Sequence, residues 1–276
     1  MNTIIISLAV LGGIGCLAAI ILYVVAQTFK VNEDPRIDQI EAILPGANCG
    51  GCGKPGCRGF AEACVKAGNL EGLRCPVGGD ATMSQVGAIL GIEVAAGDAL
   101  VAVVRCNGSC ANRPKTSQYN GTRSCIIMHN LYAGETGCRY GCLGCGDCVA
   151  ACQFGAIHMN PETGLPEVDD DKCTACGACA KACPKNIIEL RKKGPKNRRI
   201  FVSCVNKDKG GVARKACKAA CIGCGKCARN CPNEAIVRTD YIAPGHKLAS
   251  MQILAEKCVK CGACMSGCKF DAISKS

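Results

Sequence analysis

The sequence is poor in the residues that usually build a large apolar core. Among its 276 residues there is no tryptophan, and there are only five phenylalanines and five tyrosines. This composition excludes a single domain organised around one large aromatic core. Cysteine and glycine are abundant instead, with 28 and 34 residues. We therefore expect several small metal-stapled units in which inorganic clusters replace much of the missing core.

Histidine is also scarce, and no acid–base constellation is apparent. His129, His158 and His246 lie in polar or loop contexts without ligand spacing, so we expect surface residues there. The segment 13–18 matches a dinucleotide-binding G-x-G-x-x-A pattern. The apolar run around it continues unbroken, however, which leaves no place for the strand, turn and new helix of such a site. We therefore expect no catalytic residues and no flavin or NAD site on this chain.

The cysteines follow a repeated spacing. The run C-x2-C-x2-C-x3-C occurs four times, beginning at Cys142, Cys173, Cys221 and Cys258. In bacterial two-cluster ferredoxins, three cysteines of such a run bind one [4Fe–4S] cluster and the fourth binds the other cluster. Two tandem runs therefore form one two-cluster module. The predicted ligand sets are Cys142, Cys145, Cys148 with Cys183; Cys173, Cys176, Cys179 with Cys152; Cys221, Cys224, Cys227 with Cys268; and Cys258, Cys261, Cys264 with Cys231.

Zinc sites and disulfides are the alternatives to iron–sulfur clusters. Zinc closes a single tetrahedron with pairs of ligands separated by a longer loop, which does not suit runs whose fourth ligand points away. A disulfide framework needs an oxidising compartment and usually a small secreted chain. Both alternatives are weaker than ferredoxin-type ligation.

Bound clusters would change the net charge of the protein. The formal charge of +11 would ordinarily favour nucleic acid or an anionic membrane as partner. An oxidised [4Fe–4S] core with four thiolates carries about −2, so six sites would add about −12. We interpret the excess of lysine and arginine as counter-charge to the clusters, and we expect no nucleic-acid partner.

The N-terminal residues 1–29 are predicted to form a transmembrane anchor. Residues 4–26 are apolar, and as a helix they would be about 34 Å long, enough to cross a bilayer. A cleavable signal peptide is the alternative, but the chain has no basic n-region and the apolar run is too long. Because Lys30 and Arg36 follow the span and no basic residue precedes it, we expect the bulk of the chain on the cytoplasmic side.

Residues 30–80 are predicted to form a separate [4Fe–4S] domain. Cys49, Cys52 and Cys57 lie in a glycine-rich loop, and a fourth ligand must follow. The candidates are Cys64, on a predicted helix, and Cys75, in a loop and followed by proline. We favour Cys75 and expect Cys64 to be a buried thiol.

Residues 81–138 form a middle region with four cysteines outside the ferredoxin spacing. Cysteines from 125 to 152 reappear displaced by 79 positions from 204 to 231, which indicates an internal repeat. By this alignment the second copy lacks two of the four spare cysteines. We predict a sixth cluster on the first copy, held by Cys106, Cys110, Cys125 and Cys138. Alternatively, Cys125 and Cys138 pack as small buried residues, as Cys204 and Cys217 would.

The first ferredoxin module is predicted over 139–190, and a basic linker with the second module over 191–276. The linker carries Arg191, Lys192, Lys193, Lys196, Arg198 and Arg199. Three interpretations stay open for it: a solvated linker, a docking surface for an acidic redox partner, or a nucleic-acid contact.

The order of these parts resembles that of a known family. One N-terminal span, then CGGCGKPGC with a following RCPVGG, then RCNGSC and paired ferredoxin motifs is similar to the B subunit of the Rnf electron-transport complex. That complex is a membrane-bound, ion-translocating ferredoxin:NAD oxidoreductase. The resemblance covers essentially the whole chain. Its most specific element is the loop with Cys49, Cys52, Cys57 and Cys75, which holds a [4Fe–4S] cluster in that family. The chain departs from the shortest members by its second ferredoxin module and by the RCNGSC region.

The resemblance implies an electron-transfer component of a translocase in the cell (inner) membrane. The cysteine motifs described above give it five [4Fe–4S] clusters, with a sixth predicted. Soluble ferredoxin would donate electrons, and other subunits of the complex would carry the flavin, nicotinamide and ion-translocation chemistry. The alternatives are a polyferredoxin component of another anaerobic redox enzyme and a zinc-stapled interaction protein. The anchor and the RCPVGG loop argue against the polyferredoxin.

Overall fold

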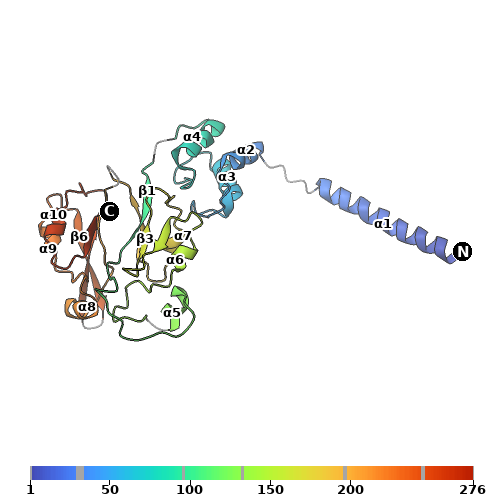
Figure 1. Cartoon of the computed structure of the whole chain (residues 1–276). Helices are drawn as coiled ribbons and strands as arrows, with labels where there is room; N and C mark the ends of the chain where they lie inside the picture. The colour runs from blue at the N-terminus through green and yellow to red at the C-terminus, as the bar shows by residue number, and fades with distance from the viewer. Residues whose placement is uncertain are drawn as a thin grey trace.

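The computed structural model describes residues 2–28, 34–94, 97–131, 134–194, 198–243 and 246–275. Lys30 and Lys196, which figure in the predictions above, lie outside these ranges. The described sheets are all two-stranded and the described helices, apart from the first, are short. Figure 1 shows a helical N-terminal domain beside a larger region of short strands and loops, with the first helix standing apart from both. The predicted architecture of small α+β modules is confirmed.

The first helix, α1 (Asn2–Thr28), contains no charged residue. Its described side chains, at position 6 and from 11 to 25, are all exposed. Over the part of the chain that is described, no helix meets both the length and the hydropathy needed to cross a membrane. The anchor over residues 4–26 therefore stays a prediction.

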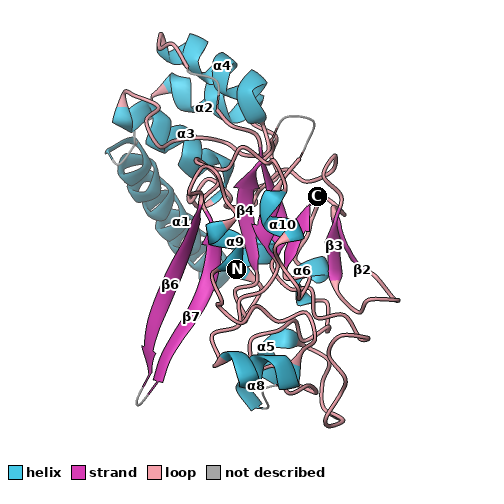
Figure 2. Cartoon of the chain, turned by 90° about the vertical axis from the view of Figure 1, so that its left-hand side faces the viewer, coloured by secondary structure: helices cyan, strands magenta, loops and turns pink. Residues whose placement is uncertain are grey.

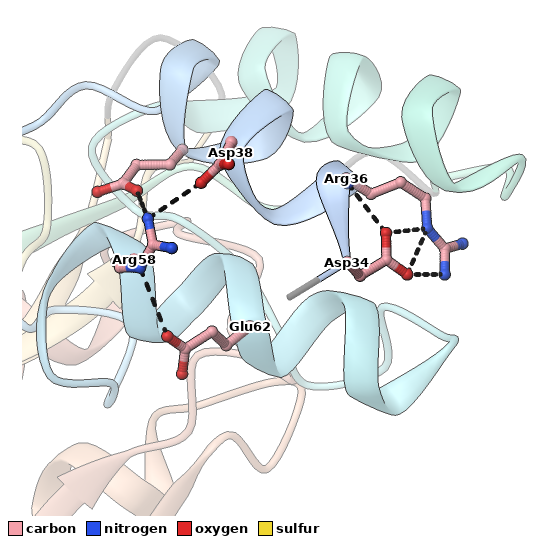
Figure 3. Close-up of polar contacts among 6 residues, drawn as sticks. Asp34, Arg36, Asp38, Arg58 and Glu62 are labelled. Atoms are coloured by element: carbon pink, nitrogen blue, oxygen red, sulfur yellow. Dashed lines mark hydrogen bonds and ion pairs between the residues drawn. The ribbon is translucent and has the colours of Figure 1, made fainter. Parts of the chain in front are cut away.

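The N-terminal domain consists of α2 (Pro35–Ile43), α3 (Gly56–Ala67) and α4 (Gly79–Leu90). The Asp34 carboxylate accepts a hydrogen bond from the Arg36 backbone N–H at 2.9 Å, and Pro35 occupies the first helical position, so the start of α2 is well capped. Arg58 of α3 reaches Asp38 and Glu41 of α2 at 3.1 and 2.7 Å (Figure 3). These ion pairs are exposed and orient the helices more than they stabilise them.

The core of this domain is small and dense. Ile40, Phe60, Ala61, Cys64 and Val86 have no exposed surface, and they come from all three helices. Cys64 is thus packed inside the helical core, as predicted. The helices cover one side of the cysteine loop between α2 and α3 and so hold that loop in place.

The first ferredoxin module is closed by a strand from outside its motifs. Strand β2 (Ile157–Met159) pairs with β3 (Pro166–Val168), and β1 (Leu100–Val104) pairs antiparallel with β4 (Ile188–Lys192). We predicted β1 in a separate middle region over 81–138. Its pairing with β4 makes it part of the first module, so the boundary before residue 139 does not separate two structural units.

The second module has the same plan. Strand β5 (Ile200–Val202) pairs with β8 (Ile273–Lys275), and β6 (Ile236–Ala243) forms a longer ladder with β7 (His246–Ile253). Figure 2 shows this long pair as the most extended feature of the region. Two further helices, α5 (Cys125–Leu131) and α8 (Gly210–Ala216), lie in the loops that precede the cysteine motifs.

Each ferredoxin motif ends in a one-turn helix that begins directly after a glycine with positive φ. In this left-handed conformation a side chain is unfavourable. The turn buries the third cysteine of the motif as the second residue of the helix. The helices are α6 (Asp147–Ala150), α7 (Ala178–Lys181), α9 (Lys226–Arg229) and α10 (Ala263–Ser266), after Gly146, Gly177, Gly225 and Gly262 at φ of 84°, 77°, 70° and 86°.

These turns predict a stability difference between two glycines of the second module. Neither Gly225 nor Gly211 has any atom within 4 Å of an added Cβ, but only Gly225 has positive φ. Gly225→Ala should therefore lower stability by about 1 to 2 kcal/mol. Gly211→Ala, within α8, should be neutral or raise stability by up to about 1 kcal/mol. Anaerobic urea unfolding of the loaded protein, followed by cluster absorption, compares them. Equal losses in both variants would contradict the explanation.

Candidate metal centres

The N-terminal domain gathers four cysteines around one cavity. Cys49, Cys52, Cys57 and Cys75 line it together with the ring of Phe60. Cys57 is fixed at the start of α3 because its backbone N–H donates to Asn48 Oδ1 at 2.8 Å. The Gly78 backbone N–H donates to Cys75 Sγ at 3.3 Å. Four thiols around one void, one of them already accepting an N–H bond, fit a [4Fe–4S] cluster.

Cys64 lies near this site but does not line the cavity. It belongs to the helical core and is fully buried. Burial raises the pKa of its thiol to about 11, and the neighbouring Cys52 and Cys75 contribute in the same direction. Cys75 thus lines the cavity with the other three cysteines and Cys64 lies behind it, and the choice of Cys75 as the fourth ligand stays a prediction.

In the first ferredoxin module, one cavity is lined by Cys152, Cys173, Cys176 and Cys179. This is one of the crossed sets predicted from the motif. Ala102 of β1 also lines the cavity, and its backbone N–H donates to Cys173 Sγ at 3.5 Å. The strand added from the middle region therefore forms a wall of this site.

The second crossed set of this module is held around α6. Burial raises the pKa of Cys148 to about 11, and thiols at Cys125, Cys183 and Cys179 act in the same direction. Burial raises the pKa of Cys142 still further, to about 12. Such thiols ionise at neutral pH only when iron compensates the charge.

The second module repeats this arrangement. Cys221, Cys224, Cys227 and Cys268 line one cavity with Met251 and Phe270. In the other set, burial raises the pKa of Cys264 to about 11, and Cys258, Cys231 and Cys261 act in the same direction.

Backbone hydrogen bonds to sulfur also repeat between the modules. The Ala156 N–H donates to Cys152 Sγ and the Ala235 N–H donates to Cys231 Sγ, both at 3.4 Å. These pairs are related by the 79-residue displacement seen in the sequence. Cys152 and Cys231, the predicted fourth ligands of their motifs, therefore have matched hydrogen-bond environments. Such bonds stabilise a thiolate and help to set the reduction potential of a cluster.

The structure does not bring the predicted quartet of the middle region together. Cys106 and Cys138 share a cavity, but with Cys204 and Cys217. Cys125 lies beside Cys145, whose thiol pKa is raised to about 11 by burial and then by Cys125. Cys110 is exposed. Within the described ranges, no three Cys, His, Asp or Glu side chains are close enough to hold a single metal ion.

The basic run after the first module is partly built into the fold, because two of its arginines are buried while Lys192 and Arg198 are exposed. Arg191 lies in β4 with 9% of its side chain exposed, and it donates to the Ile253 carbonyl at 3.1 Å. Arg199 is 4% exposed and paired with Asp170. Lys193 donates to the Asp170 carbonyl at 2.6 Å. Arg191 and Arg199 thus help to fix the two modules to each other, and a docking role for the exposed residues of the run stays a prediction.

The N-terminal site yields a test of its fourth ligand. Cys75→Ala should remove about four iron atoms from the loaded protein, the content of one cluster. Cys64→Ala should leave the iron content unchanged and cost about 1 to 3 kcal/mol, because it opens a small hole in a closed core. Iron analysis and anaerobic denaturation measure the two effects. Loss of iron from Cys64→Ala with none from Cys75→Ala would reverse the assignment.

Comparison with known proteins agrees with these sites. A family described as a 4Fe-4S dicluster domain matches residues 141–187 and 220–272, and a second family of the same description matches 172–236. A model for an Fe-S cluster domain matches 44–77. The ferredoxin-type character of both modules is thereby confirmed.

Three relatives that match most of the chain are each named as the B subunit of an oxidoreductase complex. The chain is 43% identical over 80% of its length to the B subunit of the Na(+)-translocating ferredoxin:NAD(+) oxidoreductase complex of Acetobacterium woodii, of which it spans 65%. It is 40% identical to the B subunit of the ion-translocating oxidoreductase complex of Methanosarcina acetivorans, covering 91% of this chain and 90% of that protein. A Clostridium ljungdahlii protein named as the proton-translocating counterpart is 40% identical over 86% of the chain and 82% of its own length. The chain therefore belongs to the family of B subunits of ion-translocating oxidoreductase complexes, as its order of motifs implied.

Proposed function

We propose that this chain is the electron-transfer component of a membrane-bound, ion-translocating ferredoxin:NAD oxidoreductase. It accepts electrons from reduced soluble ferredoxin and passes them to partner subunits of the complex. The [4Fe–4S] clusters supply the chemistry, since each takes up and releases one electron between its 2+ and 1+ states. The protein's part is to hold these centres in a continuous series.

The observation that carries the proposal is the direct contact between the N-terminal site and the first ferredoxin module. A Cβ on Gly51, which lies between Cys49 and Cys57, would be 2.8 Å from the Cys176 carbonyl oxygen and 2.9 Å from its Cα. Lys181 Nζ also donates to the Gly50 carbonyl at 3.3 Å. Two loops that each bear cluster ligands therefore touch backbone to backbone, which is the arrangement an electron relay requires.

Gly51 provides a test of this relay. Gly51→Val should push the two loops apart, leave the iron content unchanged, and slow reduction of one site from the other. Gly53→Ala is the matched control, because Gly53 lies in the same loop with φ of +77° but has no atom within 4 Å of an added Cβ. Gly53→Ala therefore introduces backbone strain but no steric clash with the first module. Stopped-flow reduction by reduced ferredoxin, followed by cluster absorption, measures the rates. Identical rates in both variants would remove this contact from the relay.

We further propose that α1 holds the chain on the cytoplasmic face of the membrane. It is 27 residues long and without charge, and its apolar Leu11, Leu17 and Leu22 are 69%, 62% and 68% exposed. Contact with lipid would account for such exposure. Lys30 and Arg36 follow the helix in sequence, which favours a cytoplasmic position for the domains after it.

The topology can be tested by proteolysis of sealed vesicles. Protease added to right-side-out vesicles should leave the ferredoxin modules intact, whereas inverted vesicles should lose them. Release of the whole chain by alkaline carbonate washing would contradict the anchor. Digestion in right-side-out vesicles would instead contradict the orientation, and with it the cytoplasmic ferredoxin donor.

A further inference from the structure

The most informative unassigned feature lies between the two ferredoxin modules. A cavity there is lined by four cysteines, two from each half of the chain: Cys106, Cys138, Cys204 and Cys217. None of these belongs to a ferredoxin motif. Cys138 is 7% exposed and Cys217 is 6% exposed.

The four cysteines form two structurally equivalent pairs. The last residue of β1, Val104, pairs with the first residue of β4, and the last residue of β5, Val202, pairs with the first residue of β8. The next residue in each case, Arg105 or Ser203, donates its N–H to the carbonyl just before the partner strand, at 2.6 and 2.8 Å. Cys106 and Cys204 each follow directly. They therefore occupy the same position in the two modules.

The equivalence extends to the neighbouring cysteines. Cys138 and Cys217 each precede the first motif cysteine by four residues. The Cys142 N–H donates to Cys106 Sγ at 3.5 Å, and the Cys221 N–H donates to the Cys204 sulfur. Each half thus presents two thiols in the same geometry to the shared cavity.

The structure also explains why the sequence repeat predicted a different quartet. Cys106 and Cys142 are 36 positions apart, against 17 for Cys204 and Cys221. The additional residues contain Cys110 and Cys125. A fixed displacement of 79 therefore aligned Cys204 with Cys125 and left Cys106 without a counterpart.

Polar groups around the cavity suit an anionic cluster. Arg113 lines it with 9% of its surface exposed, and its Nε has no hydrogen-bond partner. Asn206, 1% exposed, donates from its side-chain amide to Cys138 Sγ at 3.6 Å. A buried guanidinium with an unused donor costs free energy unless a negative charge lies beside it. A four-thiolate iron–sulfur cluster would supply that charge.

We propose that Cys106, Cys138, Cys204 and Cys217 together bind a sixth [4Fe–4S] cluster at the interface of the two modules. The assignment stands on the geometry of the thiols and goes beyond the electron-transfer proposal. Only its use as a bridge in the relay rests on that proposed function. On each side, one backbone hydrogen bond would connect a ligand of this site to a ferredoxin motif: from Cys142 to Cys106 and from Cys221 to Cys204.

Iron analysis of the full chain, purified anaerobically in mild detergent, tests the ligand set. The wild type should contain about 24 iron atoms, and single alanine variants at 106, 138, 204 and 217 should contain about 20. Cys110→Ala and Cys125→Ala are the controls and should retain about 24, because neither lines the cavity. The decisive variants are Cys204→Ala and Cys217→Ala, since the two candidate quartets differ there.

Three results would overturn the proposal. The first is a wild type with about 20 iron atoms, and the second is one zinc atom bound in place of the sixth cluster. The third is iron loss from Cys110→Ala and Cys125→Ala with none from Cys204→Ala and Cys217→Ala.

General unfolding is recognised by loss of more than four iron atoms. In that case Cys204→Ser distinguishes a lost ligand from general unfolding. A serine oxygen ligand should keep the iron and change one signal in the paramagnetic resonance spectrum of the reduced protein. An unchanged spectrum would also overturn the proposal. None of these measurements uses ferredoxin or partner subunits, so failure of the electron-transfer function would leave them unaffected.

Discussion

Ligation of iron by buried thiolates is the interaction on which the rest of this structure depends. Burial raises the pKa of Cys142 and Cys204 to about 12 and that of Cys227 to about 11. Without a compensating cation these thiols stay protonated. Iron binding displaces the thiol protons, and the clusters take the place of a large aromatic core. Folding and cluster binding are therefore coupled. The protein also becomes sensitive to acid, because protons compete with iron for the same sulfur atoms.

The parts of the fold that sequence predicted are the parts determined locally. The spacing of the four ferredoxin motifs fixes which cysteines share a cavity, because a left-handed glycine and a single helical turn set the geometry within a few residues. The preference for Cys75 over Cys64 followed from the same kind of argument, since a helix-face thiol packs inward and a loop thiol before proline does not. In both cases the deciding pattern lies within one motif or loop, although the fourth cysteine of each crossed set comes from the neighbouring motif.

The errors came from contacts between distant segments. Pairing of β1 with β4 joins positions nearly ninety residues apart, and no local pattern marks β1 as part of the ferredoxin module. The equivalence of Cys106 and Cys204 is hidden in the sequence because an insertion separates Cys106 from Cys138. Arg191 and Arg199 looked solvated because basic runs usually are, yet strand pairing and Asp170 draw them inside.

The buried arginines explain how a basic chain can hold so many anionic centres. Arg113 faces the intermodule cavity, and Arg199 has two buried nitrogens without hydrogen-bond partners, Nε and Nη1. In a protein without clusters, such groups would be costly to bury. Arg199 is paired with Asp170. Beside the proposed intermodule cluster, which would carry about −2, Arg113 would instead neutralise charge where water cannot. On the proposed function, this placement has a further consequence. Positive charge near a cluster favours its reduced form, so an arginine between the modules would make the intermodule centre easier to reduce than an otherwise equal centre lacking that charge. Electrons would then move from one module to the other through a step set by Arg113, rather than by distance alone.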